Sequence, residues 1–181
     1  MDNTFNPSTE ILFQDPGQKF PWINIALFGL TCLSTLVVGA FLMAGFTETL
    51  GESLGSFFLG IWGQPSLLLS GLPFSIAIMT ILLAHEMGHY LACRHYGIAA
   101  TLPYFIPAPT IVGTMGAFIR IKSPIHHRSA LLDVGVAGPI AGFVFAVPAL
   151  VIALAQSRFA VIHPATSTFA FGEPLIFKVI A

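Results

Sequence analysis

Long runs without charged residues dominate this sequence. Ile23 to Phe46 and Val134 to Ala155 carry no charge, and the same holds for Ser53 to Ala84. About 20 apolar residues suffice to cross the hydrocarbon core of a bilayer. We therefore predict three transmembrane helices, over Ile23–Phe46, Leu72–Cys93 and Val134–Ala155. A further apolar run, Phe169–Ala181, is too short to cross.

The composition supports a lipid environment. Of the 181 residues, 55% are hydrophobic and only 8% are charged, whereas a soluble domain has about 25% charged residues. The net charge of −1 gives no reason to expect a nucleic-acid partner. The fold class predicted is an all-α polytopic membrane protein whose surroundings are the lipid bilayer.

The N-terminal segment lacks the basic region of a secretory signal. We interpret residues 1–21 as a cytoplasmic tail and residues 22–181 as a membrane-embedded domain. This orientation follows the positive-inside rule: with the N-terminus in the cytoplasm, five basic residues fall on the cytoplasmic side, namely Lys19, Arg94, Arg120, Lys122 and Arg128. We expect a bacterial plasma membrane, with an organelle membrane as the alternative.

The motif HEMGH, at residues 85–89, interrupts the second predicted span. Residues four apart share a helix face, so His85 and His89 can direct both imidazoles at one point. Two imidazoles supply part of a catalytic zinc site, and Glu86 beside them can take a proton from water. With nine residues to Arg94, His85 lies roughly 13 Å below the membrane surface at 1.5 Å per residue.

Polar contacts between helices are the structural alternative for this trio, but unpaired polar groups are costly in lipid. We favour the metal site. Cys93 lies about 12 Å along the helix from His85 at the same rise, too far to bind the same ion, and is interpreted as a packing residue. Gly88 narrows the helix and permits another segment to approach closely.

The segment between the second and third spans is rich in proline and glycine. Its prolines exclude a helix, and the alternation in GAFIRIK predicts a short strand over Gly116–Lys122. Gly113 and Gly116 allow tight turns. Two interpretations remain open: a re-entrant, β-hairpin-like segment whose strand holds an unwound substrate by β-augmentation, or an ordinary amphipathic loop.

The third span opens with DVGVAGPIAGF. Gly138 and Gly142 form a small-xxx-small pair that predicts close packing against the second helix. Pro139 is expected near the helix start, where its missing N–H costs little. Asp133 is interpreted as an interfacial cap of this helix, and it is not assigned to the metal.

Four blocks, in this order, resemble the site-2 protease family of intramembrane zinc metalloproteases: ILLAHEMGHYLACRHYGI, LPYFIPAP, GTMGAFIRIKSP and LLDVGVAGPIAGF. The resemblance covers roughly Gly71 to Pro148. It implies regulated intramembrane proteolysis, in which a peptide bond of a single-span membrane protein is hydrolysed with zinc-bound water as the nucleophile. It also implies roles for individual residues: zinc ligands His85 and His89, general base Glu86, and substrate-binding hairpin residues Gly113, Gly116, Ala117 and Phe118.

The family takes its third zinc ligand from an aspartate in a downstream Leu-Asp-Gly motif, which does not occur here. We therefore expect a C-terminally truncated chain that is inactive by itself, with the third ligand beyond Ala181. Two other functions stay open. A transporter could use the trio as an ion pathway, without stoichiometric zinc. An inactive adaptor of the same fold would lack the aspartate even at full length. The sequence indicates neither the substrate's identity nor the oligomeric state.

Overall fold

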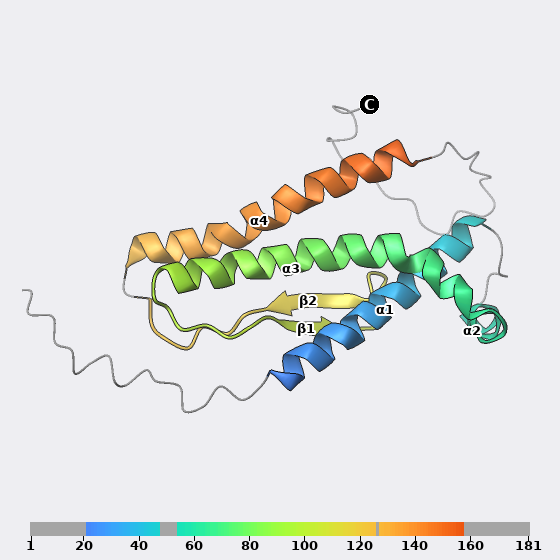
Figure 1. The fold of residues 1–181 in the computed structure, drawn as a ribbon, viewed down its shortest axis with the longest axis horizontal. Coiled ribbons are helices and arrows are strands. Elements are labelled where there is room, and N and C mark those ends of the chain that lie inside the picture. The colour runs from blue at the N-terminus through green and yellow to red at the C-terminus, as the bar shows by residue number, and fades with distance from the viewer. Residues whose placement is uncertain (1–20, 48–53, 126, 158–181) are drawn as a thin grey trace, which may run out of the picture. The chain divides into compact units, whose positions relative to one another are not determined.

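The computed structural model describes residues 21–47, 54–125 and 127–157, so nearly all of the predicted tail 1–21 and the run Phe169–Ala181 lie outside the described residues. The described part of the second compact unit, Leu150–Ala181, completes the last helix, and the features below belong to the first, Met1–Ala149. The elements (Figure 1) are α1 Trp22–Thr47, α2 Leu54–Gly63, the 3₁₀ helix η2 Pro65–Gly71, α3 Leu72–His95, β1 Tyr104–Pro107, β2 Thr114–Phe118 and α4 Arg128–Ala155.

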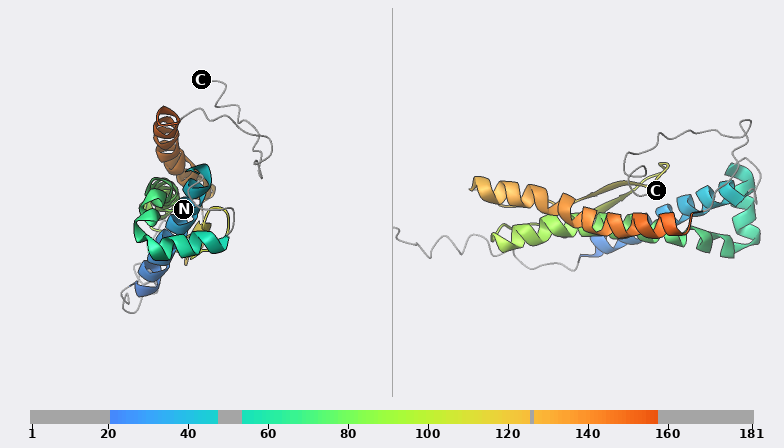
Figure 2. Two further views of the ribbon diagram at one scale, coloured as in Figure 1. Left: turned by 90° about the vertical axis from the view of Figure 1, so that its right-hand side faces the viewer. Right: turned by 90° about the horizontal axis from the view of Figure 1, so that it is seen from above.

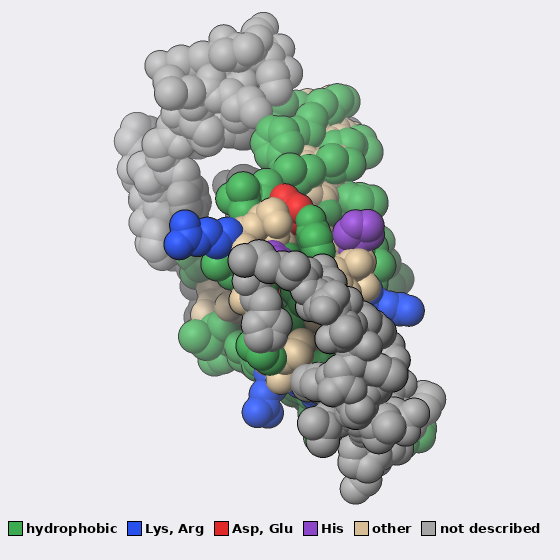
Figure 3. All heavy atoms as spheres, turned by 90° about the vertical axis from the view of Figure 1, so that its left-hand side faces the viewer, with side chains coloured by type: hydrophobic (Ala, Val, Ile, Leu, Met, Phe, Trp, Pro, Cys, Tyr) green, Lys and Arg blue, Asp and Glu red, His purple; other side chains and the backbone are tan. Residues whose placement is uncertain are grey.

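Three helical stretches are long and apolar enough to cross a membrane: Trp22–Gly45, Pro65–His95 and Arg128–Ala155. Many of their large apolar side chains are exposed on the protein, which suits contact with lipid and not with water. Figure 3 shows this hydrophobic covering and the basic side chains around the end where α3 stops and α4 starts. The chain is a mainly helical, multi-pass integral membrane protein.

The predicted spans differ from the helices mainly at their ends. The first two predictions match α1 and α3 to within two residues, while the uncharged residues before Leu72 form α2 and η2. The third helix begins at Arg128, six residues before the predicted start at Val134. Pro139 consequently lies inside α4 and not near its start, so that prediction was wrong.

A small antiparallel sheet of β1 and β2 follows α3 (Figure 1). Tyr104 pairs with Phe118 and Phe105 with Ala117, but Pro107 pairs with Thr114. One residue of β1 therefore opposes two of β2, a β-bulge that contains Gly116 at a φ of +103°. The strand predicted over Gly116–Lys122 thus lies earlier, although an isolated bridge between Ala100 and Ile121 extends the pairing. Re-entry of this hairpin into the membrane stays a prediction.

Helix α1 packs against both the hairpin and α3 (Figures 1 and 2). The Asn24 side-chain amide donates to the carbonyls of Leu102, at 3.0 Å, and Pro103, at 2.8 Å. Farther along α1, the Ser34 hydroxyl donates to the Gly113 carbonyl at the hairpin tip, at 2.6 Å. Hydrogen bonds therefore attach the hairpin backbone to α1 both just before β1 and at the turn between the strands.

The contact of α1 with η2 and α3 combines a small residue, at the end of η2, with hydroxyl groups. The hydroxyls of Thr35 and Ser75 lie 2.7 Å apart and are both buried. A Cβ added to Gly71 would lie 2.2 Å from the Leu36 carbonyl oxygen, so only glycine permits this approach. Close approach through small residues, supplemented by hydroxyl bonds, is a common way to pack helices in lipid.

The end of α3 is held by a buried apolar cluster. Gly97, at a φ of +67°, ends the helix, and the N–H of Ile98 returns to the Cys93 carbonyl at 2.8 Å. Cys93 is fully buried and packs with Ile98, Ala130 and Val134. The interpretation of Cys93 as a packing residue is confirmed.

Candidate metal centre

The two histidines of the motif face each other on one side of α3. The Nε2 atoms of His85 and His89 lie 3.2 Å apart, as the spacing of four residues predicts. Two nitrogens bound to one tetrahedral zinc at about 2.0–2.1 Å would be separated by about 3.3 Å. The imidazoles are thus already spaced as a pair of ligands would be.

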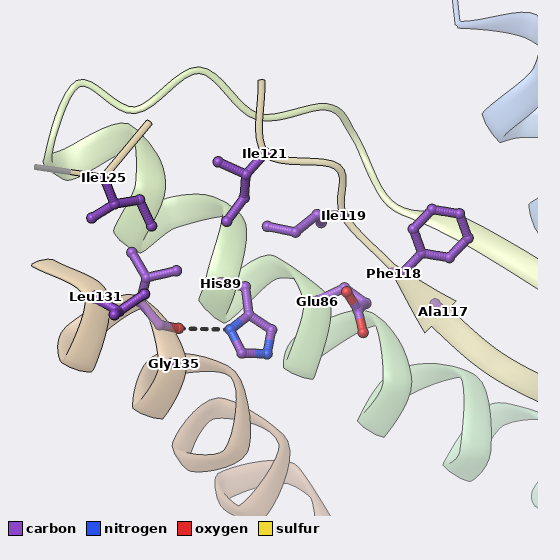
Figure 4. A pocket seen from close by; sticks show the side chains of 10 residues that line it. Glu86, His89, Ala117, Phe118, Ile119, Ile121, Ile125, Leu131 and Gly135 are labelled. Carbon is purple, nitrogen blue, oxygen red and sulfur yellow. Dashed lines mark hydrogen bonds between the residues drawn. The ribbon is translucent and has the colours of Figure 1, made fainter. Parts of the chain in front are cut away.

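The tautomer of His89 follows from its second contact. Its Nδ1 lies 2.6 Å from the backbone carbonyl oxygen of Val134 on α4, shown as a dashed line in Figure 4. A carbonyl only accepts hydrogen bonds, so Nδ1 carries the proton and donates it. Nε2 is therefore the unprotonated nitrogen of the neutral ring, and it faces His85 Nε2. Metal-ligating histidines commonly have their other nitrogen bonded in this way.

Glycines let α4 approach the histidines closely. A Cβ on Gly138 would lie 2.1 Å from His89 Nε2, and one on Gly142 would lie 3.2 Å from His85 Nδ1. In the opposite direction, a Cβ on Gly88 of α3 would meet the Ala137 carbonyl oxygen at 2.4 Å. The close packing predicted from the glycine pair, and the close approach predicted at Gly88, are both confirmed.

Glu86 lies beside this pair, at the wall of a pocket of about 390 Å³. Its side chain is only 5% exposed, and the backbone N–H of Ile119, directly after β2, hydrogen-bonds to its carboxylate. Figure 4 shows Glu86 and His89 projecting from α3 toward the same space. A buried carboxylate and the His89 imidazole therefore border one pocket.

Comparison with known sequences identifies the family. The profile of peptidase family M50 matches residues 73–180, more than half of the chain. The chain belongs to peptidase family M50. This confirms the resemblance to the site-2 proteases.

Several curated relatives of this M50 chain are named as zinc metalloproteases. The probable zinc metalloprotease EGY2, chloroplastic, of Arabidopsis thaliana is 36% identical over 122 residues, which cover 67% of this chain and 20% of that protein. The probable zinc metalloprotease EGY1, chloroplastic, of Oryza sativa subsp. japonica is 33% identical over 140 residues, covering 71% and 24%. The chain thus spans about a fifth of the length of these relatives. No solved structure matches it.

The residues of this M50 chain fit part of a zinc site. His85 and His89 present converging nitrogens, and the Val134 carbonyl fixes the tautomer of His89 that binding needs. Within the described ranges, no group of three histidine, cysteine, aspartate or glutamate side chains is placed to hold a metal ion. The described part therefore offers two nitrogen ligands.

The four predicted substrate-binding residues are divided between two places. Ala117 and Phe118 line the pocket next to Glu86. Gly113, at a φ of +81°, lies at the hairpin tip against α1, and Gly116 lies in the bulge. Only the first two are beside the candidate metal centre.

Asp133 does not cap α4. It lies within the helix, which starts at Arg128, and its Oδ2 accepts a hydrogen bond from the Tyr96 hydroxyl. This bond, which favours the protonated phenol, raises the pKa of Tyr96. The predicted role as a cap was wrong because α4 begins five residues before Asp133, at Arg128.

Most of the pocket lining was not predicted. Besides Glu86, His89, Ala117 and Phe118, it consists of Ile119, Ile121, Ile125, Leu131, Val134 and Gly135. In a sequence this apolar, hydropathy gives no contrast between a side chain that faces a pocket and one that faces lipid. No signal in the sequence singles out the isoleucines or Leu131.

Proposed function

We propose that this chain carries the catalytic core of an intramembrane zinc metalloprotease. The reaction is hydrolysis of a peptide bond within or near the transmembrane segment of a single-span membrane protein, as in regulated intramembrane proteolysis. One observation carries the proposal: the imidazoles of His85 and His89 meet at 3.2 Å, and His89 and Glu86 line one pocket, on a helix that is apolar enough to span a membrane. Family membership and the named relatives support it.

In this proposal the imidazoles of His85 and His89 would hold zinc. A further ligand comes from outside the described residues. When bound, zinc lowers the pKa of water and polarises a carbonyl oxygen. The Val134 carbonyl orients His89 by accepting its Nδ1 proton, and the glycines of α4 leave room for the two rings.

Glu86 acts as the general base. Its carboxylate takes a proton from the attacking water and returns it to the amine that leaves when the peptide bond breaks. The backbone N–H of Ile119 orients the carboxylate, and its burial among apolar groups limits competing water. Position and seclusion together suit this carboxylate to proton transfer.

The hairpin is proposed to re-enter the membrane and to hold the substrate in extended form. A transmembrane helix hides its peptide bonds in internal hydrogen bonds, so a substrate has to be unwound locally before cleavage. Ala117 and Phe118 belong to β2 and line the pocket, which places a strand directly beside Glu86. Pairing with this strand would keep the substrate extended at the base.

The proposal is tested by Glu86→Gln in the full chain. The amide keeps the shape of the side chain but cannot accept the proton, so cleavage of a single-span substrate should fall by about 10²–10⁴-fold. Bound zinc, measured per chain, should be unchanged. His89→Ala serves as the matched variant that should lose both zinc and cleavage. Undiminished cleavage by the Glu86→Gln protein would overturn the role of the base.

A further inference from the structure

The pocket beside the candidate metal centre has two chemically different parts. Glu86 and His89 provide the polar groups at one part of its wall. In Figure 4, Ile121, Ile125 and Leu131 lie together on the side of His89 away from Glu86. A substrate whose peptide bond lies at Glu86 would therefore have an apolar space within reach of a neighbouring side chain.

This apolar part is built from three segments. Ile121 comes from the chain after β2, Ile125 from the loop before α4, and Leu131 from the first turns of α4. Ile125 also packs against the buried cluster formed by Cys93, Ile98, Ala130 and Val134. The cluster supports the wall from behind, so the space is bounded by packed structure.

The exposed fractions of the residues in this apolar wall show where a bound side chain would bury the most apolar surface. Leu131 is 60% exposed and Ile121 is 40% exposed, whereas Val134, deeper in the wall, is buried. A large apolar side chain placed between Leu131 and Ile121 would cover the exposed surface of both residues and remove it from water or from loosely packed lipid. A charged or strongly polar side chain would find no side-chain partner among Ile121, Ile125 and Leu131, and would lose hydration without compensation.

We propose that Ile121, Ile125 and Leu131 form a specificity subsite for one large apolar side chain of the substrate. This inference rests on the proposed function. The occupant is a branched aliphatic or aromatic residue next to the peptide bond that is cleaved. The whole pocket, its polar part included, has a volume of about 390 Å³, at the lower end of the range for ligand pockets, about 300–1,000 Å³. It thus suits one bulky side chain with its adjoining backbone.

The test uses single-span substrates that differ only at the residue beside the cleaved bond: leucine, phenylalanine, alanine or aspartate. The full-length, unmodified protein should cleave the leucine and phenylalanine substrates at least about tenfold faster, in kcat/KM, than the alanine and aspartate ones. Leu131→Trp should fill the subsite and reverse the order of phenylalanine and alanine. Leu132→Trp is the matched control, since Leu132 is 66% exposed on the same helix and does not line the pocket; its order should be unchanged.

A binding measurement separates this inference from the proposed function. In the Glu86→Gln protein, which should bind without cleaving, the leucine peptide should bind at least about tenfold more tightly than the aspartate peptide, and Leu131→Trp should remove the difference. Equal cleavage of all four substrates, or a Leu131→Trp protein with unchanged order, would overturn the subsite while leaving the protease intact. Cleavage of none by the full-length, unmodified protein would overturn the proposed function, and the subsite with it.

Discussion

Helix α3 meets α4 through glycines that lie against its histidines, whereas its bonds to α1 come from hydroxyl groups. On the α4 side, Gly88, Gly138 and Gly142 bring backbone and imidazole rings into direct contact. On the α1 side, Thr35 bonds to Ser75 of α3, while Asn24 and Ser34 bond to the hairpin. The two sides hold different parts of the site: α4 sets the imidazoles, and α1 sets the hairpin beside Glu86.

This difference has a consequence for substitutions. Where a glycine contact leaves no space for a Cβ, a larger residue cannot be accommodated without moving its neighbours, because packed interiors yield by only a few tenths of an ångström. An interhelical hydrogen bond in lipid contributes only about 0.6 kcal/mol on average. Changes to the glycines that face α4 should therefore be severe and affect the metal, while loss of the hydrogen bonds made by α1 should be mild, with the substrate affected through the hairpin.

The largest effect is expected for Gly138→Ala. The new methyl would lie 2.1 Å from His89 Nε2, so the ring has to leave its place and its bond to Val134. Disturbing such an orienting contact costs about 10–100-fold in metal affinity. Zinc affinity by competition with a chelator measures this. Gly29→Ala, where a Cβ meets nothing within 4 Å, is the control, and equal affinities for the two variants would contradict the account.

Gly88→Ala should have the next largest effect. Its methyl would lie 2.4 Å from the Ala137 carbonyl oxygen, and backbone cannot rotate away as a side chain can. The two helices have to separate, at a cost of about 1–3 kcal/mol of stability. Thermal unfolding in detergent should show a lower Tm together with weaker zinc binding. An unchanged Tm would mean that α3 and α4 are not packed this closely.

Asn24→Leu should act on the substrate and spare the metal. The variant loses two hydrogen bonds to the hairpin backbone, at Leu102 and Pro103. Neutral hydrogen bonds contribute about 0.5–1.5 kcal/mol each, so kcat/KM for a single-span substrate should fall about tenfold. Zinc per chain should stay at the level of the unmodified protein. Loss of zinc in this variant would show that the two sides of α3 are not separable.

The smallest effect is expected for the bond between Thr35 and Ser75. A double-mutant cycle of Thr35→Val and Ser75→Ala should give a coupling energy of about 0.6 kcal/mol, with zinc binding unaffected. Reversible unfolding in mixed micelles provides the free energies. A coupling above about 2 kcal/mol would exceed what interhelical hydrogen bonds in membranes usually give and would make the α1 side as rigid as the α4 side.

The spans and the shared face of His85 and His89 could be predicted because each depends on local spacing. The length of an apolar run and the four-residue period of a helix need no knowledge of the rest of the chain. The glycines of α4 could be matched to α3 for a similar reason, since small residues in lipid predict close contacts. These features depend on residues that are close together in the sequence, so they could be predicted without the folded structure.

The remaining features depend on contacts between distant segments. The start of α4 was predicted too late because Asp133 was taken as a boundary, whereas the helix extends back to Arg128. The bulge at Gly116 shifts the strand relative to a simple alternation. Asn24 lies in an apolar run with no sign of its partners 78 and 79 residues away. Such features require the folded chain.

The most direct test of the account is the coordination of the metal itself. X-ray absorption at the zinc edge of the full-length protein should show two imidazole nitrogens at about 2.0–2.1 Å. The Glu86→Gln protein should give the same spectrum, and His85→Ala should retain one imidazole at most. Zinc with no imidazole scattering, or a His85→Ala spectrum identical to that of the unmodified protein, would contradict the claim that His85 and His89 hold the ion.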